Sequence, residues 1–284
     1  MKFVFWDFLL ALVEPPNPPT QKLPIFPPMA KTILSYNLNG IRAALNKGFV
    51  DWIDQHDFDV ICIQETKAQP EQVDMSEFED RGYHAHWHSA EKKGYSGVLT
   101  LSREQPDLVA SGMGIDEYDR EGRVLRTDLG DLTILNCYFP SGTTGDVRQA
   151  VKMRFLEDML VWANTLKQER PNLLIVGDYN IAHTEMDIHD PKGNKNSSGF
   201  LPEEREWMTR WFASGFVDTF RHAHPDEIAY SWWTFRANAR ANNKGWRIDY
   251  QSVSPPLADK IIDAGHYPEA VHSDHCGVWL TLDL

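Results

Sequence analysis

Short, continuous runs of apolar residues recur along the chain from Lys31 onward, and longer segments with helical periodicity lie between them. A run of Val, Ile and Leu without polar alternation is typical of a strand that is covered on both faces. Strands are therefore expected at 32–36, 59–63, 83–87, 97–101, 123–128, 132–138, 172–176, 230–234, 247–253 and 277–282. Sheets built from such strands have to be buried under helices or under each other.

The segments between the apolar runs predict the helices. Helices are expected at 48–55, 146–168 and 203–213. The longest of them carries Val151, Phe155 and Met159 at four-residue spacing, which places these side chains on one face. Pro202, followed by acidic residues, is typical of a helix N-terminus. Together the elements predict an α/β domain with two packed sheets and helices outside.

The N-terminal segment differs from the rest of the chain. Met1–Val13 is an apolar run that resembles a weak signal peptide, but Asp7 interrupts it. Residues 15–28 are rich in proline, which is typical of an extended linker. We expect residues 1–28 to be a disordered extension or the product of an upstream start, and residues 29–284 to form a single domain.

Cysteine usage and net charge limit the compartment and the partners. The three cysteines, Cys62, Cys137 and Cys276, stand in hydrophobic surroundings, so we expect buried free thiols and a cytoplasmic location. No segment has the pattern of a transmembrane helix, and no membrane partner is expected. The formal net charge of −13 argues against a nucleic-acid partner unless basic residues gather at one local surface.

Polar residues cluster where the expected strands end, which is where α/β enzymes usually place their sites. The segments are Tyr36–Gly40, Gln64–Lys67, Tyr138–Pro140, Gly177–Asn180, Trp246–Tyr250 and Ser273–His275. A single acid or amide after a strand is commonly a turn or cap residue. Their recurrence at several strand ends favours a catalytic site.

The residue types in these segments match the needs of phosphodiester hydrolysis. A hard cation prefers carboxylate ligands. The candidates are Glu65 together with either Asp249 or Asp274. Proton transfer from water needs a base, for which Asp178 and His275 are the candidates. Charge that builds on phosphoryl oxygens needs neutral donors. The candidate donors are Asn37, Asn180 and Tyr138. Direct attack by water is the simplest mechanism, since no Ser or Cys nucleophile is implied.

Several longer stretches are too idiosyncratic to arise by chance: Gly177–His183, Lys192–Asn194, Ser198–Arg205, Tyr230–Tyr250 and Ser273–Cys276. They resemble the exodeoxyribonuclease III and apurinic-apyrimidinic (AP) endonuclease family of the endonuclease/exonuclease/phosphatase superfamily. The resemblance runs from about Thr32 to Leu284 and implies a DNase I-like four-layer α/β sandwich, with two packed β-sheets flanked by helices. It also implies a DNA-repair enzyme that cuts DNA 5′ to abasic sites, with 3′-phosphodiesterase, 3′-phosphatase and 3′→5′ exonuclease activity.

The resemblance implies a metal centre at the strand ends. Glu65 resembles the family's principal metal ligand, Asn37 sits beside it, and Asp274 resembles a second, often indirect, metal contact. Asp178 resembles the residue that activates the attacking water, which Asn180 helps to place. The expected ion is Mg²⁺, with Mn²⁺ also possible, and the number of ions, one or two, is left open.

The resemblance also implies the contacts to substrate. Tyr138 resembles a phosphate-contacting tyrosine, and His275 resembles a phosphate-binding histidine held by Asp249. The residues that resemble the apolar wall for a flipped-out abasic sugar are Trp232, Trp246 and Ile248.

Basic and amide residues in the loops are expected to hold the DNA backbone and so to offset the negative net charge. One candidate group comprises Arg236, Arg240, Lys244 and Arg247. Further expected contacts are Asn194, Arg42 and Lys67. The expected partner is double-stranded DNA with abasic sites or blocked 3′ ends, and no obligate protein partner is implied.

Two positions depart from the family's pattern, and two other functions stay open. Ser141 and Ser197 stand where many relatives carry Asn, which concerns DNA grip rather than the metal centre. The same catalyst could act on inositol phosphates or sphingomyelin, as in other branches of the superfamily. A DNA-binding module without catalysis would need substituted catalytic positions, and none of the matched positions is substituted.

Overall fold

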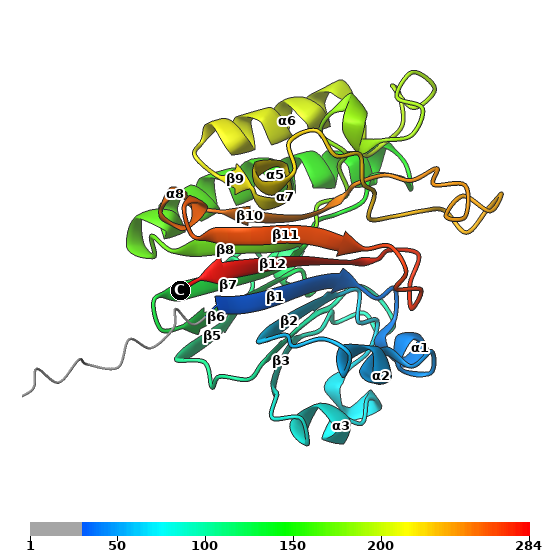
Figure 1. Cartoon of the computed structure of the whole chain (residues 1–284). Coiled ribbons are helices and arrows are strands. Elements are labelled where there is room, and N and C mark those ends of the chain that lie inside the picture. The colour runs from blue at the N-terminus through cyan, green and yellow to red at the C-terminus, as the bar shows by residue number, and fades with distance from the viewer. Residues whose placement is uncertain (1–29) are drawn as a thin grey trace, which may run out of the picture.

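Two six-stranded β-sheets form the centre of the computed structural model, which describes residues 30–284 (Figure 1). Sheet A consists, in spatial order, of β11 (Ile261–Tyr267), β12 (Gly277–Asp283), β1 (Ala30–Asn37), β2 (Val60–Gln64), β4 (Val98–Ser102) and β3 (His84–His88). Sheet B consists of β5 (Leu108–Ser111), β6 (Val124–Leu129), β7 (Leu132–Tyr138), β8 (Leu173–Asp178), β10 (Asp249–Val253) and β9 (Val217–Asp218). The predictions made for residues 1–28 lie outside the described residues.

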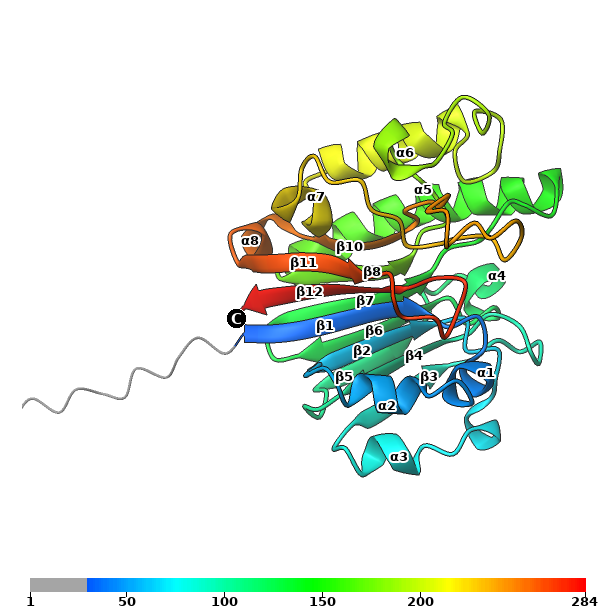
Figure 2. The same cartoon turned by 45° about the vertical axis from the view of Figure 1, so that its right-hand side comes forward.

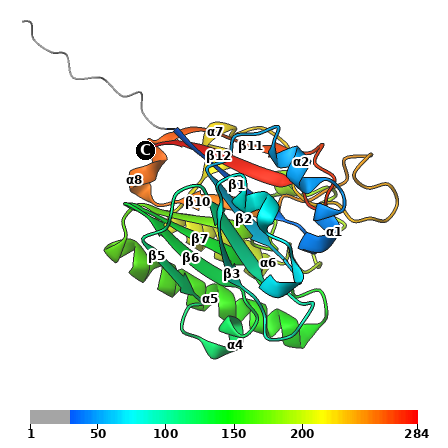
Figure 3. The same ribbon diagram turned by 90° about the horizontal axis from the view of Figure 1, so that it is seen from below.

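Helices cover the outer face of each sheet (Figures 1 and 2). On the side of sheet A lie α1 (Ile41–Leu45), α2 (Phe49–Ile53) and α3 (Ser76–Glu79). On the side of sheet B lie α5 (Asp146–Glu169) and α6 (Pro202–Ala213). The shorter elements are η1 (Pro70–Gln72), α4 (Asp116–Asp119), η2 (Glu185–Asp187), α7 (Thr219–Ala223) and α8 (Pro255–Ala258). Figure 3 shows α5 running alongside β5, β6 and β7.

Apolar side chains fill the space between the layers. Between the sheets, Ile33 and Cys62 of sheet A belong to the same cluster as Ile134 and Val176 of sheet B. These residues come from the continuous apolar runs, because a strand between a sheet and a helix layer must be apolar on both faces. The prediction of a four-layer sandwich is therefore confirmed.

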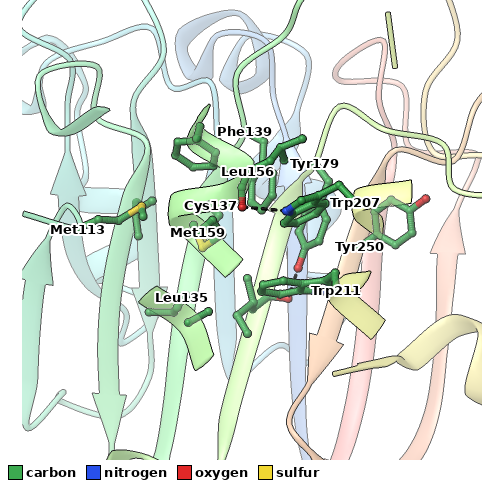
Figure 4. Close-up of a cluster of buried hydrophobic side chains, with 14 of the residues drawn as sticks. Met113, Leu135, Cys137, Phe139, Leu156, Met159, Tyr179, Trp207, Trp211 and Tyr250 are labelled. Carbon is green, nitrogen blue, oxygen red and sulfur yellow. Dashed lines mark hydrogen bonds between the residues drawn. The ribbon is translucent and has the colours of Figure 1, made fainter. Parts of the chain in front are cut away.

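The largest apolar cluster lies between sheet B and the helices α5 and α6 (Figure 4). Phe139 stacks on Tyr179 with ring centroids 4.2 Å apart. Trp207 is fully buried, and its indole Nε1 donates a hydrogen bond to the carbonyl oxygen of Leu156 at 2.8 Å. Because α5 and α6 are held against sheet B in this way, they give rigid support to the residues at the ends of β7 and β8.

Nine of the ten predicted strands and all three predicted helices form within two residues of their predicted bounds, but one predicted strand is wrong, and β5, β9 and β11 were not predicted. Segment 230–234 forms no strand: Trp232 makes only isolated bridges to Trp246 and His275. Its β-like composition reflects burial against these neighbours, since tertiary contacts override local propensity. The predicted strand 247–253 begins only at Asp249.

Two further expectations can be compared with the described residues. Cys62, Cys137 and Cys276 are buried free thiols, as predicted. Among residues 30–284, no helix has the length and apolar character needed to cross a membrane.

Candidate active site

The polar strand ends meet at one edge of the two sheets. β1 and β2 are parallel neighbours in sheet A, and β7 and β8 are parallel neighbours in sheet B. Parallel neighbours end on the same side, so Asn37 and Glu65 lie together, as do Tyr138 and Asp178. Asp249, the first residue of β10, pairs across the sheet with Asp178. His275 lies two residues before β12 and completes the group.

One amide joins the two halves of the site. The side-chain nitrogen of Asn37 donates to Glu65 Oε1 and to Asp178 Oδ2, each at 2.9 Å. The Asn37 side-chain oxygen accepts the backbone N–H of Asn39 at 2.9 Å, which fixes the orientation of the amide. Asn37 is fully buried and links a carboxylate of sheet A to one of sheet B.

Several residues of the site hold a left-handed backbone. The φ angles are 51° at Glu65, 49° at Lys67 and 55° at Asn180. Such angles are uncommon for residues other than glycine and persist where surrounding contacts over-determine them. For Asn180 those contacts include its backbone N–H, which donates to Asp178 Oδ1 at 2.8 Å, and its side-chain nitrogen, which donates to the Phe139 carbonyl at 3.0 Å.

A histidine–aspartate pair closes the site. His275 Nδ1 lies 2.8 Å from Asp249 Oδ2, and His275 Nε2 lies 3.9 Å from Asp178 Oδ2. Burial disfavours the imidazolium, but Asp249 outweighs this and raises the pKa of His275 to about 10. The ring is therefore a cation at neutral pH, with its Nε2–H on the side of Asp178.

Asp178 carries a perturbed carboxyl group. Burial, followed by the charge of Asp249 and opposed by that of His275, raises the pKa of Asp178 to about 8. Glu65 behaves differently: burial acts against its carboxylate, but Lys67, with Nζ 2.7 Å from Glu65 Oε2, and Asn37 hold the pKa below its ordinary value. Carboxyl groups with pKa values pushed apart are typical of functional sites.

A metal ion could be held here. Within residues 30–284, Glu65, Asp178 and His275 form the one set of three potential ligands with atoms inside 4.8 Å of one another. Asp274 lies beside them, but Asn39 donates to one of its oxygens at 2.9 Å and the Trp232 indole to the other at 3.0 Å.

A cleft of about 1190 Å³ opens over these residues. The predicted wall residues Trp232, Trp246 and Ile248 all line it, and the two indole rings meet edge to face with centroids 6.0 Å apart. Gly199 faces this wall with φ +95°, and a Cβ there would lie 3.0 Å from the ring of Trp246. Glycine at this position allows the loop to pack against the wall.

Other residues around the cleft include both departures from the family's pattern. Ser141 and Ser197 line it, as do Tyr138 and Arg123. Burial first, and then the charge of Glu65, keeps the pKa of Tyr138 well above its ordinary value, so its phenol stays a donor. The guanidinium of Arg123 lies 4.9 Å from the centre of the Tyr138 ring.

The predicted DNA contacts lie outside the cleft lining, with different exposures. Arg42 and Arg236 are exposed, so both are accessible to a backbone that runs past the cleft, whereas Asn194 is half-buried. The side chain of Asn194 donates to the backbone of its own loop, at His189 and Asp190. Lys67 is half-buried against Glu65.

The prediction that Arg247 contributes to a DNA-backbone grip is wrong, whereas that for Arg240 stays a prediction. Arg247 is fully buried, 2.8 Å from Asp187 and 2.7 Å from Asp218. Arg240 stacks on Trp233 and donates to backbone carbonyls, including that of Ser273 at 3.0 Å. Both arginines therefore support the loops that carry the site.

Two residues that contact the catalytic groups were not predicted from the sequence. Ser231 Oγ donates to Asp249 Oδ2 at 2.6 Å, on the oxygen that His275 also contacts. Lys152 donates from α5 to the backbone carbonyl of Asn180 at 2.8 Å. The only sequence signal was a lysine beside the apolar stripe of a helix, and Ser231 gave none.

Comparison with known proteins agrees with this geometry. Residues 34–275 match the profile of the endonuclease/exonuclease/phosphatase family. The chain is 42% identical over 254 residues to an exodeoxyribonuclease of Bacillus subtilis, covering 89% of this chain and 99% of that protein. It is 38% identical over 257 residues to the DNA repair nuclease APEX1 of Danio rerio, covering 88% of this chain and 81% of the relative. A solved AP endonuclease from Archaeoglobus fulgidus superposes with a TM-score of 0.83 at 28% identity, covering 89% of this chain and all of that one.

Proposed function

This chain belongs to the endonuclease/exonuclease/phosphatase family, within its exodeoxyribonuclease and AP endonuclease branch, and from that premise we propose that it is a DNA-repair phosphodiesterase of the exodeoxyribonuclease III type. It hydrolyses DNA 5′ to abasic sites and removes blocking groups from 3′ ends. The observation that carries the proposal is the meeting of Glu65, Asp178 and the Asp249–His275 pair under an apolar-walled cleft.

The donor set fits a hard divalent cation. Carboxylate oxygens are the ligands that Mg²⁺ and Mn²⁺ prefer, and three buried or half-buried carboxylates face one histidine here. Asp249 Oδ1 is buried and has no hydrogen-bond partner among the described residues. Glu65 would hold the ion, with Asp178 and Asp274 as nearby oxygen donors. A bound Mg²⁺ would supply charge neutralisation at the phosphoryl oxygens.

The chain's own residues divide the remaining chemistry. His275 is held as a cation by Asp249, so it serves as a donor to the phosphoryl oxygens rather than as a base. A cation bound beside Asp178 would favour its charged form, which leaves this carboxylate as the group that takes a proton from the attacking water. The side-chain nitrogens of Asn37 and Asn180, at 2.9 and 3.2 Å from Asp178 Oδ2, orient that carboxylate.

The cleft wall supports abasic DNA as the substrate. An abasic sugar carries no base to stack, so its extrusion from the helix costs less than flipping a paired nucleotide. A wall made by Trp232, Trp246 and Ile248 has the apolar character that would receive the bare sugar. The phosphate on its 5′ side would then face the residues at the strand ends.

One assay tests the proposal. Three labelled oligonucleotides are incubated with the full chain and Mg²⁺: an abasic duplex, an intact duplex and a duplex with a 3′-phosphate. We expect cleavage 5′ to the abasic site, slower action on the intact duplex, and loss of all activity in EDTA that returns with Mg²⁺ or Mn²⁺. Equal rates on the abasic and intact duplexes would refute the abasic specificity, and full activity in EDTA would refute the metal requirement.

A further inference from the structure

A fully buried ion pair lies behind Asp178–Asn180, the catalytic turn. Lys152 of α5 and Glu204 of α6 both have 0% exposed side chains, and Lys152 Nζ lies 2.6 Å from Glu204 Oε1. Removing two charges from water is costly, and apolar replacements of buried pairs are often equally stable. Stability alone therefore does not explain why a lysine interrupts the apolar face of α5.

On one side the pair holds the catalytic turn. Lys152 Nζ donates to the backbone carbonyl oxygen of Asn180 at 2.8 Å. Asn180 is the left-handed residue whose N–H and side chain both contact the Asp178 carboxylate. The lysine thus fixes the peptide that follows the turn, and with it the conformation of Asn180.

On the other side the pair holds residues 197–201, the wall loop, which packs against the cleft wall. Glu204 Oε2 accepts the backbone N–H of Gly199 at 2.6 Å and that of Leu201 at 3.0 Å. A Cβ on Gly199 would lie 3.0 Å from Trp246 and 3.1 Å from the Asn180 carbonyl. The catalytic turn and the wall loop therefore share one buried pair.

We propose that Lys152 is a positioning residue for hydrolysis: it aligns Asn180 with Asp178, and through Glu204 it keeps the wall loop in register with them. The inference rests on the proposed function for its activity readout. Small displacements of catalytic groups by distant changes cost up to about 10²-fold in rate. Loss of Lys152 should therefore lower kcat more than it alters KM.

The sharpest test is the double variant Lys152→Met with Glu204→Gln. Lys152→Met alone leaves Glu204 as an unpaired buried charge, so it is expected to lower Tm. The double variant removes that charge and should recover most of the Tm. Its kcat on the abasic duplex should stay about 10- to 100-fold below wild type, with KM changed less than about threefold.

Met159→Ala is the matched control. Met159 is fully buried on α5, two turns after Lys152, and belongs to the apolar cluster between sheet B and the helices α5 and α6. Its truncation therefore destabilises the helix that carries Lys152. Its kcat should stay within about twofold of wild type at a temperature where the variant is folded. A double variant that regains both Tm and kcat, or a control that loses as much kcat, would overturn the proposal.

Hydrogen exchange keeps this inference separate from the proposed function. Backbone amides in peptides that cover 178–182 and 197–201 should exchange faster in the double variant than in wild type. Their exchange rates should be unchanged in Met159→Ala. This readout needs no substrate, so it decides the positioning role even if the wild type leaves abasic DNA uncut. Unchanged exchange in both peptides would refute the role.

Discussion

Two buried clusters of charge flank the start of β10, and they differ in balance. The catalytic cluster consists of Glu65, Asp178, Asp249 and His275. The anchor cluster consists of Asp187, Asp218, Arg221 and Arg247. Arg247 and Asp249 are two residues apart in sequence, so one short segment contributes to both.

The anchor cluster is neutral. Arg247 contacts Asp187 at 2.8 Å and Asp218 at 2.7 Å, and Arg221 contacts Asp187 at 2.7 Å. Burial opposes the Asp187 carboxylate, but Arg247 outweighs it and holds the pKa of Asp187 far below its ordinary range. Two anions meet two cations, and nothing further is needed to keep them charged.

The catalytic cluster is not neutral. Three carboxyl groups share one imidazolium, and the only other cation in contact with them among the described residues is Lys67, which pairs with Glu65. The pKa of Asp178 accordingly rises to about 8. Balanced buried charges compensate one another, whereas unbalanced buried charge needs a cation or a proton from outside. The contrast separates scaffold from site without reference to relatives.

The largest expected effect is on turnover. Asp178→Asn keeps the shape of the side chain but removes the base, so kcat should fall about 10²- to 10⁴-fold while Tm in EDTA does not fall. The same change in the anchor cluster, Asp187→Asn, should lower Tm and leave kcat within a few-fold at 25 °C. Steady-state kinetics and thermal melts of both variants check the pair. If both variants lose turnover equally, the distinction between the clusters fails.

Next comes the stability of the anchor cluster. Arg247→Met leaves two buried carboxylates short of a cation, which should cost about 3–5 kcal/mol in the free energy of unfolding. The control is Arg210→Met, which breaks the surface pair with Glu157 and should cost about 0–1 kcal/mol. Urea denaturation measures both values. Similar losses in the two variants would contradict the anchoring role.

A smaller effect concerns the coupling inside the catalytic cluster. His275→Ala removes a donor to the phosphoryl oxygens and should lower kcat about 10²-fold or more. Asp249→Ala acts through the same histidine, so the double variant should be little worse than His275→Ala alone. Single-turnover rates for the three variants measure this. Multiplicative losses would mean that the two residues act independently.

The smallest effect is a pH dependence of opposite sign in the two clusters. The folded pKa of Asp178 is raised from 3.8 to about 8, so its favourable contribution to stability is lost as pH rises through that range. The folded pKa of Asp187 is lowered, so its contribution is present above about pH 4 and is lost below it. In EDTA, Tm should fall from pH 6 to about pH 8 in wild type, and less in Asp178→Asn.

Divalent cation sharpens this comparison. Added Mg²⁺ favours the charged form of the carboxylates and should flatten the fall in wild-type Tm over the same range. Parallel melting curves for wild type and Asp178→Asn in EDTA would show that Asp178 does not titrate in this window.

The strand-end residues were predictable because each lies next to a recognisable apolar run. Glu65 directly follows β2, Asp178 is the last residue of β8, and His275 lies two residues before β12, so topology alone brings them together. The inward turn of Arg247 was not predictable, since only the fold shows that Asp187 and Asp218 are its neighbours. Segment 230–234 failed for the same reason: its apolar residues are buried by partners distant in sequence.

The order of the strands along the chain divides the catalytic residues between two parts of the sequence. Sheet B is formed by one uninterrupted stretch, 108–253, whereas sheet A is assembled from the stretches before and after it. The inner stretch is thus a cassette that carries Asp178 and Asp249, and the flanks carry Asn37, Glu65 and His275. A chimaera in which this cassette comes from one relative and the flanks from another would take some of its catalytic residues from each parent. Its turnover would report how faithfully two separately evolved sheets dock.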